Sequence, residues 1–238
     1  MHKELLIFLL FSCKVSSSQD ALDIPYEEDV QYWQNGNKKY EVLQTEAEDN
    51  DYAFTYWFPN GKVQKTGCFD NVYYPLYYIY SSYDSTGKSL VVNGNGVHKE
   101  YYENGKLKEK GLIKNGLQIG IWKSYYQNGK LKSIGKYKLS NWKINNIIRK
   151  DSLWKFYFDN GQISSTRFYH DGLPYGIANF YYKDGKIRSV EENYKYTKAW
   201  NKYGKQTLFN GTGKKIIYHD NGKIKSIIFC TKNEIDSA

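Results

Sequence analysis

The chain has 238 residues, of which 40% are hydrophobic, 25% charged and 18% aromatic, with 25 tyrosines and 20 glycines. This composition excludes a disordered chain and favours β-structure with many tight turns. No run of about 18 apolar residues is present, which excludes a multi-span helical membrane protein, and 3 cysteines exclude a disulfide-stapled mini-protein. The net charge of +9 is lopsided, because residues 19–51 carry ten acids and two bases and residues 52–238 carry 30 bases and 14 acids.

The first 18 residues have the pattern of a signal peptide. Lys3 precedes the seven-residue apolar run 5–11, which is too short to span a bilayer. Leu10-Phe11-Ser12-Cys13 resembles a lipobox, so we predict lipidation at Cys13 and an exported, membrane-anchored lipoprotein of the cell envelope. Ordinary cleavage after Ser18, giving a periplasmic or secreted protein, and a buried N-terminal strand are the alternatives.

Residues 19–51 form an acidic segment with a net charge of −8, in which Asn35-Gly36 is a degenerate copy of the repeat found downstream. An acidic segment followed by the basic residues 52–238 indicates either pairing of the two within the chain or an anionic partner for the basic part.

Residues 52–238 contain a repeated motif of Asn or Asp, Gly, and Lys or Gln. Gly105 and Gly129 are 24 residues apart, as are Gly161 and Gly185, whereas an eight-residue insertion within 138–152 lengthens the spacing between Gly129 and Gly161. A fixed period of this kind is typical of repeat architectures. The motif occurs at 60–62, 104–106, 128–130, 160–162, 184–186 and 221–223.

Asn-Gly between β-forming residues predicts a hairpin with a two-residue type I′ loop, because that turn needs positive φ at both central residues. A two-residue loop fixes the register. It pairs Tyr102 with Leu107 and Tyr101 with Lys108, and equivalent residues in the other hairpins. Asn115-Gly116 and Asp171-Gly172 are predicted to be turns that connect one hairpin to the next.

This register, with side chains alternating between faces, places Trp122 and Trp154 on a packed face. It places tyrosine beside lysine or arginine on the opposite face, where a basic ladder could bind an acidic protein or another polyanion, with tyrosine supplying cation–π contacts. The alternative is a solvated face on which lysine stems cover tyrosine rings and keep the sheet soluble. The candidate binding residues are Tyr101, Lys108, Tyr125, Lys132, Tyr181, Arg188, Tyr218 and Lys225.

The string Gly-Ile-Trp-Lys-Ser-Tyr-Tyr-Gln-Asn-Gly-Lys-Leu at 120–131 resembles the MORN-repeat variant found in bacteria, whose members include YwqK-type antitoxin proteins. The resemblance covers about residues 52–229. It implies an all-β fold, an elongated single-layer antiparallel array of stacked β-hairpin repeats that acts through interactions. The chain departs from the pattern at 71–83, 138–152 and 200–204, and the family supplies no catalytic residues to transfer.

No catalytic or cofactor-binding constellation is evident in the sequence. The histidines, at positions 2, 98, 170 and 219, lack metal-ligand spacing, and there is no Cys/His cluster. We therefore predict a non-enzymatic exported repeat protein without a cofactor, serving as a protein-binding or scaffolding module. The alternatives are a toxin-neutralising protein, as the family label suggests, and an envelope protein that binds anionic lipid or polysaccharide. Nucleic acid is disfavoured by export. Cys68 and Cys230 are predicted to be free thiols, since an open array keeps them apart.

Overall fold

The computed structural model describes residues 29–44, 51–142, 145–219 and 221–231, except for 71–75. Every element in these residues is a β-strand, and the expected all-β array of antiparallel hairpins is confirmed. The strands are β1 Asp29–Tyr32, β2 Lys38–Gln44, β3 Asp51–Trp57, β4 Val63–Asp70, β5 Leu76–Tyr83, β6 Ser89–Val92, β7 Asn95–Tyr101, β8 Leu107–Lys114, β9 Leu117–Tyr125, β10 Leu131–Trp142, β11 Asn145–Tyr157, β12 Ile163–His170, β13 Leu173–Tyr181, β14 Ile187–Glu192, β15 Lys195–Trp200, β16 Gln206–Phe209, β17 Thr212–Tyr218 and β18 Ile224–Cys230.

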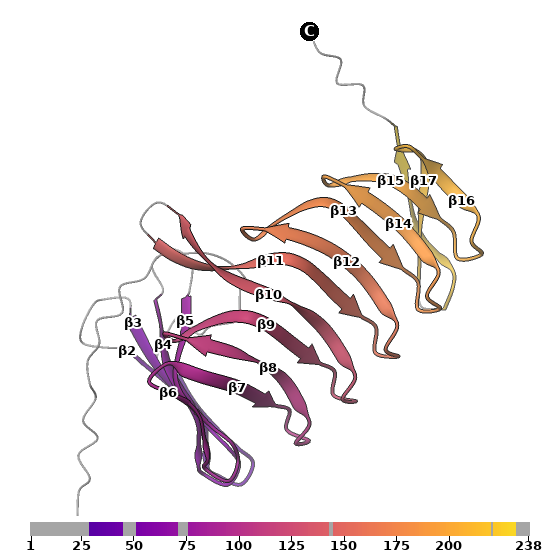
Figure 1. Ribbon diagram of the computed structural model, residues 1–238. Coiled ribbons are helices and arrows are strands. Elements are labelled where there is room, and N and C mark those ends of the chain that lie inside the picture. Colours follow the sequence, from indigo (N-terminus) through magenta and orange to yellow (C-terminus); the bar gives the residue numbers. More distant parts are fainter. Residues whose placement is uncertain (1–28, 45–50, 71–75, 143–144, 220, 232–238) are drawn as a thin grey trace, which may run out of the picture. The chain divides into compact units, whose positions relative to one another are not determined.

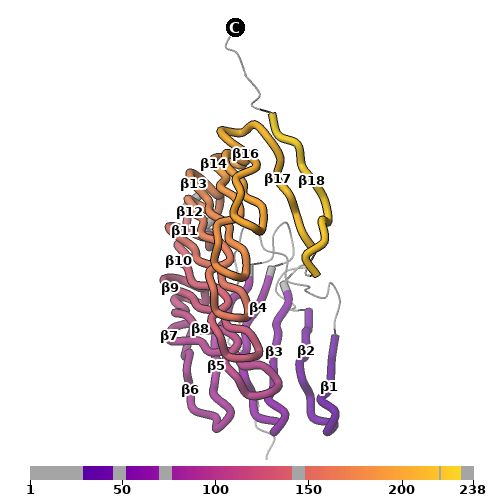
Figure 2. Tube along the Cα trace, turned by 90° about the vertical axis from the view of Figure 1, so that its right-hand side faces the viewer, coloured from indigo at the N-terminus to yellow at the C-terminus, as the bar shows by residue number. Residues whose placement is uncertain are grey.

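The chain divides into two units, each built from consecutive antiparallel strands. The first comprises Met1–Lys99, Leu112–Gln118 and Leu139–Ile148, and the second comprises Glu100–Gly111, Ile119–Lys138 and Arg149–Ala238. In the first unit each strand from β1 to β6 pairs with its successor, and β1, β2 and β3 lie side by side (Figure 2). In the second unit β9 pairs with β10, and each strand from β11 to β17 pairs with its successor (Figure 1).

The predicted two-residue loop at the Asn-Gly-Lys motifs is wrong, because these hairpins close with three residues. The Tyr102 amide donates to the Lys106 carbonyl at 2.8 Å, and the Gly105 amide donates to the Tyr102 carbonyl at 2.9 Å. Gly105 has φ +77° whereas Asn104 is not left-handed, which is a type I turn followed by a left-handed glycine. The Asn104 side chain favours this turn, because its Oδ1 accepts from the Lys106 amide at 3.1 Å.

The predicted pairs are therefore wrong by one residue. Tyr125 lies opposite Leu131 instead of Lys132, Tyr181 lies opposite Ile187, and Tyr218 lies opposite Ile224. A slip of one residue moves side chains to the other face of a sheet. The same three-residue loop closes at Asn35-Gly36, where the Trp33 amide donates to the Asn37 carbonyl.

Type I′ turns form instead at the other ends of the strands, where the connecting turns were expected. Both central residues have positive φ at Asn115-Gly116, Asp171-Gly172 and three further turns, at 93–94, 193–194 and 210–211. Two-residue loops leave His170 opposite Leu173 and Phe209 opposite Thr212.

The asparagines of the three-residue loops also join neighbouring hairpins. Asn160 Nδ2 donates to the Lys183 carbonyl at 2.9 Å, and Asn128 Nδ2 donates to the Asp159 carbonyl at 2.8 Å. Asn35 and Asn60 make the same type of bond in the first unit. Both polar atoms of the asparagine amide are therefore used. The oxygen accepts a hydrogen bond within its own turn, and the nitrogen donates one to the turn of the next hairpin.

Replacing Asn160 by Asp tests this joint, because aspartate keeps the acceptor for the Gln162 amide and loses the donor. We expect Asn160→Asp to lower the free energy of unfolding by about 1 kcal/mol, measured by urea denaturation at high salt to screen the added charge. The matched control is Asn221→Asp, since Asn221 accepts from the Lys223 amide but makes no such donor contact among the described residues. Equal losses in the two variants would contradict the role of the amide nitrogen.

The core of the first unit is aromatic. Phe54, Phe69 and Val42 are each 2% exposed, and half-buried tyrosines pack around them. Phe54 stacks on Tyr77 with ring centres 4.3 Å apart, and Lys65 lies over the Tyr56 ring at 4.4 Å. Aromatic side chains on one face supply large apolar area to strands that no second layer of the described residues covers.

Part of the core of the second unit is a row of residues that crosses the strands, here called the central row. It contains Gly111, Trp122, Gly135, Trp154, Arg167, Ala178, Glu191, Tyr196 and Lys215. Trp122 and Trp154 are 4% and 3% exposed, as expected for the packed face. A Cβ on Gly111 would lie 2.1 Å from the Trp122 ring, and one on Gly135 would lie 2.0 Å from the Trp154 ring. The two indoles therefore lie over glycines of the preceding strands. We call the side of the sheet that carries the central row the tryptophan face.

Three further predictions concern the insertion, the two cysteines and the signal segment. The insertion within 138–152 lies in β10 and β11, which have 12 and 13 residues. Cys68 and Cys230 form no disulfide, as predicted, and the first is buried and the second half-buried. The signal segment with Cys13 lies outside the described residues. Among the residues that the structure describes, no helix has the length and apolarity needed to cross a membrane.

Candidate binding face and pocket

Two basic residues of the predicted ladder, Lys132 and Arg188, lie on the tryptophan face, away from the tyrosines assigned to them. Lys132 Nζ lies 5.8 Å from the centre of the Tyr126 ring, and Tyr126, which directly follows β9, continues the alternation that puts Trp122 and Ser124 on one side of that strand. Arg188 lies over the Phe180 ring at 5.6 Å, and Phe180 shares its face with Ala178. The predicted pairs Tyr125–Lys132 and Tyr181–Arg188 are therefore not brought together, as the one-residue register change requires.

Lys108 is held by an acid. Its Nζ donates to Glu100 Oε1 at 2.7 Å, and the pKa of Lys108 is raised above its usual value. Burial of Lys108 opposes this shift, and the charges of Glu100 and Glu109 outweigh the burial. Lys108 is thus partly neutralised and contributes less to a basic surface than its charge suggests.

The tyrosines of the predicted ladder are half-buried. Tyr125 and Tyr181 lie opposite Leu131 and Ile187. Tyr218 packs against Tyr182 with ring centres 6.3 Å apart, and Tyr101 is the last residue of β7. Lys225 is exposed on β18. The eight predicted residues thus do not form one ladder.

Cations lie over rings along the tryptophan face. Lys150 Nζ is 5.2 Å from the Trp154 ring and 5.6 Å from the Tyr169 ring, and Lys215 Nζ is 3.4 Å from the Tyr196 ring. Trp122, Tyr137, Trp154 and Tyr169 themselves form a series of edge-to-face contacts, with centres between 5.0 and 6.3 Å apart. This face combines positive charge with aromatic surface, which is the chemistry the sequence had placed on the other side.

The central row changes character after Trp154. Ala178 stands seven residues before its turn glycine, as do Trp122 and Trp154, and Arg167 stands six residues after its turn glycine, as do Gly111 and Gly135. Ala178 lies opposite Glu191, and Arg167 Nη2 donates to Glu191 Oε2 at 2.7 Å. The small–large pairing of glycine with tryptophan is replaced here by a partly buried ion pair beside a small alanine.

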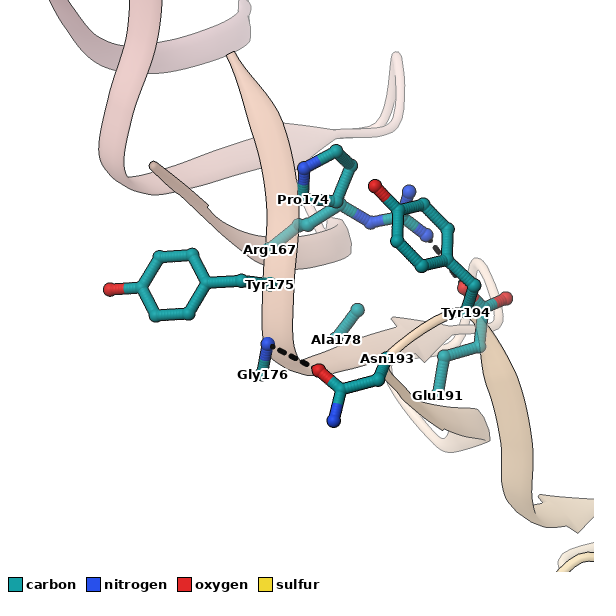
Figure 3. Close-up of a pocket in the computed structure, with 8 residues that line it drawn as sticks. All are labelled: Arg167, Pro174, Tyr175, Gly176, Ala178, Glu191, Asn193 and Tyr194. Carbon is teal, nitrogen blue, oxygen red and sulfur yellow. Dashed lines mark hydrogen bonds and ion pairs between the residues drawn. The ribbon is translucent and has the colours of Figure 1, made fainter. Parts of the chain in front are cut away.

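A shallow hollow opens to solvent beside Ala178 (Figure 3). The rings of Pro174 and Tyr194 and the Arg167 guanidinium lie on the same side of β13, whereas Tyr175 projects to the other side. Asn193 Oδ1 accepts from the Gly176 amide at 3.2 Å, which ties the β14–β15 turn to the rim. The residues that line it are Arg167, Pro174, Tyr175, Gly176, Ala178, Glu191, Asn193 and Tyr194.

Lys215 occupies the tryptophan position of the last hairpin, seven residues before Gly222. It is only 7% exposed, and burial together with the nearby Arg188 charge lowers the pKa of Lys215 to about 8. Glu191 and Cys230 act in the opposite direction. The C-terminal part of the central row is thus polar where the preceding part is apolar.

Sequence reasoning missed the central row, although the signal was present. The positions that are 7 residues before and 6 residues after each turn glycine hold Trp122, Gly135 and Trp154, and then Arg167, Ala178 and Lys215. A change from apolar to charged residues at one repeat position breaks the local pattern, and such breaks mark candidate functional sites.

Comparison with known proteins gives one informative match. The family model described as MORN repeat variant matches residues 53–71, 95–115, 118–139, 150–171 and 204–233. These stretches leave 172–203, which contain Ala178, Glu191 and Tyr194, between the fourth and fifth repeats. No curated protein matches the chain.

Among solved structures, a chain of the structure titled "Crystal Structure of TcdB2-TccC3-Cdc42" is 11% identical, with a TM-score of 0.22 over 87% of this chain. The match spans 11% of that chain, and a TM-score this low does not show a shared fold. The hairpins, their recurrent turns and the five matched repeats agree with one another. The chain belongs to the MORN repeat variant family.

Proposed function

We propose that this protein is a non-enzymatic binding or scaffolding module whose tryptophan face binds an acidic protein partner. The observation that carries the proposal is the coincidence of cations and aromatic rings on one face of the second unit, at Lys132, Lys150 and Arg188. Aromatic and arginine side chains dominate the energy of protein interfaces, and positive charge speeds the encounter with an acidic partner.

The charge balance supports an anionic partner. Residues 52–238 carry a net charge of +16, and Arg167 on the tryptophan face is paired with an acid, Glu191. Salt bridges to a partner's carboxylates would form beside ring surfaces, where water is scarcer and screening is weaker.

Export to the cell envelope with an anchor at Cys13 belongs to the same proposal, and it rests on the signal pattern alone. Neutralisation of an envelope toxin is the form of the function that the family label favours. The next experiment separates this proposal from two competing explanations. In one, the same face binds an anionic lipid or polysaccharide; in the other, the lysine stems only keep the rings soluble.

The test is charge reversal with a matched control on the opposite face. Lys132→Glu with Lys150→Glu changes the tryptophan face, and Lys123→Glu with Lys155→Glu changes the other face at equal charge. Lys123 and Lys155 are each one residue from a buried tryptophan, on the alternate side of the strand. We expect a partner captured from envelope fractions to bind the first variant at least about tenfold more weakly at low salt, and the control much as it binds wild type.

Equal losses in the two variants would show that only the total charge matters and would overturn the assignment of the face. Release of the partner by phospholipase or glycosidase treatment, with no protein recovered, would replace the protein partner by lipid or polysaccharide. If both double variants bound the partner as strongly as wild type at every salt concentration, the proposal would be overturned. The lysines would then serve only to keep the rings soluble.

A further inference from the structure

The hollow beside Ala178 differs from the basic face, because its floor is already neutralised. Arg167 and Glu191 form a 2.7 Å ion pair, with side chains that are 24% and 14% exposed. A carboxylate entering the hollow would meet Glu191, and an ammonium group would meet Arg167. An apolar group would displace water from the ion pair without forming hydrogen bonds in its place, and such desolvation of buried charges costs free energy.

Tyr194 forms one wall of the hollow in an unfavourable backbone conformation. It has φ +68° at the second central position of a type I′ turn, where the sister turns have Gly94, Gly116, Gly172 and Gly211. A bulky residue is a true outlier at positive φ, and such strain costs on the order of 1–3 kcal/mol. The Tyr194 side chain is nevertheless 66% exposed, so packing within the described residues does not account for keeping it there.

The walls and floor of the hollow together define one ligand chemistry. Tyr194 and Pro174 offer flat apolar surface at the rim, while Arg167, Glu191 and the Asn193 amide offer donors and acceptors within one small space. Hydroxyl groups donate and accept at once, so a vicinal pair can satisfy both members of an ion pair. The hollow is shallow, with room for only about one water-sized group, so a ligand ring would lie across its mouth against Tyr194 and a hydroxyl would enter.

We propose that this hollow is a carbohydrate subsite that holds one neutral pyranose ring, with the apolar face of the sugar on Tyr194 and its hydroxyls on the Arg167–Glu191 pair. The site exists because Ala178 stands where the two preceding Asn-Gly hairpins have Trp122 and Trp154. It is independent of the acidic partner proposed for the basic residues, since it contributes no net charge.

The decisive variant is Tyr194→Gly. Glycine is the residue of the sister turns, so this change removes the backbone strain and we expect the variant to fold. The probes are glucose, galactose and N-acetylglucosamine, titrated into the full chain while amide shifts of Gly176, Asn193 and Tyr194 are followed by NMR. We expect saturable shifts with at least one sugar in wild type, and for Tyr194→Gly a higher melting temperature with affinity weakened roughly tenfold, equivalent to about 1.4 kcal/mol.

Two further variants sharpen the result. Ala178→Trp with Arg167→Gly restores the pairing seen at Gly135 and Trp154, and we expect it to fold and to bind no sugar. Tyr203→Ala removes another tyrosine, 78% exposed, and should bind as wild type does. The proposal is overturned if none of the three sugars shifts the rim amides, or if Tyr194→Gly binds as tightly as wild type. Retained sugar binding in the Lys132→Glu and Lys150→Glu variant distinguishes this subsite from the basic face.

Discussion

Gly135→Ala is expected to lower the free energy of unfolding by roughly 3 kcal/mol, at the upper end of the cost of overpacking a core. The added methyl group would lie 2.0 Å from the Trp154 ring, and several ring atoms lie within 2.5 Å. The indole is 3% exposed and contacts Tyr137, Tyr169 and Phe156, so it cannot move aside without disturbing three other rings. The backbone at Gly135 is not left-handed, so the effect is purely steric.

The measurement is equilibrium unfolding in urea, with two companion variants. Gly105→Ala places a methyl group in open space at φ +77° and should cost only about 1–2 kcal/mol from backbone strain. Trp154→Ala should cost about 3–5 kcal/mol, and combining it with Gly135→Ala should cost clearly less than the sum, because the clash disappears with the indole. Strict additivity would show that Gly135 and Trp154 do not share this space.

Lys215→Met is expected to stabilise the protein by roughly 3 kcal/mol at neutral pH, since one unit of pKa shift corresponds to about 1.36 kcal/mol. Burial and the Arg188 charge lower the pKa of Lys215 from 10.5 to about 8 in the folded chain. The unfolded chain therefore binds more protons between these two values, and wild-type stability rises as the pH increases from about 8 to 10.5. Below about pH 8 the full cost of burying the ammonium is present, and methionine avoids it.

The pH profile checks this mechanism better than one stability value. The advantage of Lys215→Met should be constant below about pH 8 and should fade as the pH approaches 10.5. Tyr182, whose pKa is raised to about 12 by burial, stays neutral in the folded chain over this range, so its effect is the same in both proteins and cancels in the difference. The control is Lys214→Met on the exposed neighbouring residue, which should change stability by less than about 0.5 kcal/mol at every pH. A difference that does not depend on pH would attribute the gain to packing instead of charge.

The positions of the strands and turns could be predicted from the sequence. Turn glycines at fixed spacing, at Gly105, Gly129, Gly161 and Gly185, lie at the ends of strands in the structure, and Trp122 and Trp154 are buried as expected. The reason is local, because positive φ at a turn strongly favours glycine or asparagine and the alternation of side chains follows from the strand itself. These constraints act within a few residues and need no knowledge of neighbouring hairpins.

The register could not be deduced from Asn-Gly alone. The dipeptide fits a two-residue loop and a three-residue loop, and the choice depends on the residue before it and on the neighbouring hairpin. Pro59 was one local sign, because proline suits the first position of a type I turn and cannot donate in a strand. The bond from Asn60 Nδ2 to the Ser85 carbonyl and its counterparts are contacts between hairpins, which no single repeat reveals.

The sequence by itself determined that this is an all-β repeat protein and where its turns fall, because those properties follow from backbone conformations of individual residues. Only the tertiary structure decided which side chains share a face. The shift of one residue moved Lys132 and Arg188 from their predicted tyrosine neighbours to Tyr126 and Phe180. It also brought Arg167 and Glu191 together beside Ala178, across residues 24 apart in the chain. Contacts between strands depend on register, and register is fixed by hydrogen bonds and packing that form only when the hairpins assemble.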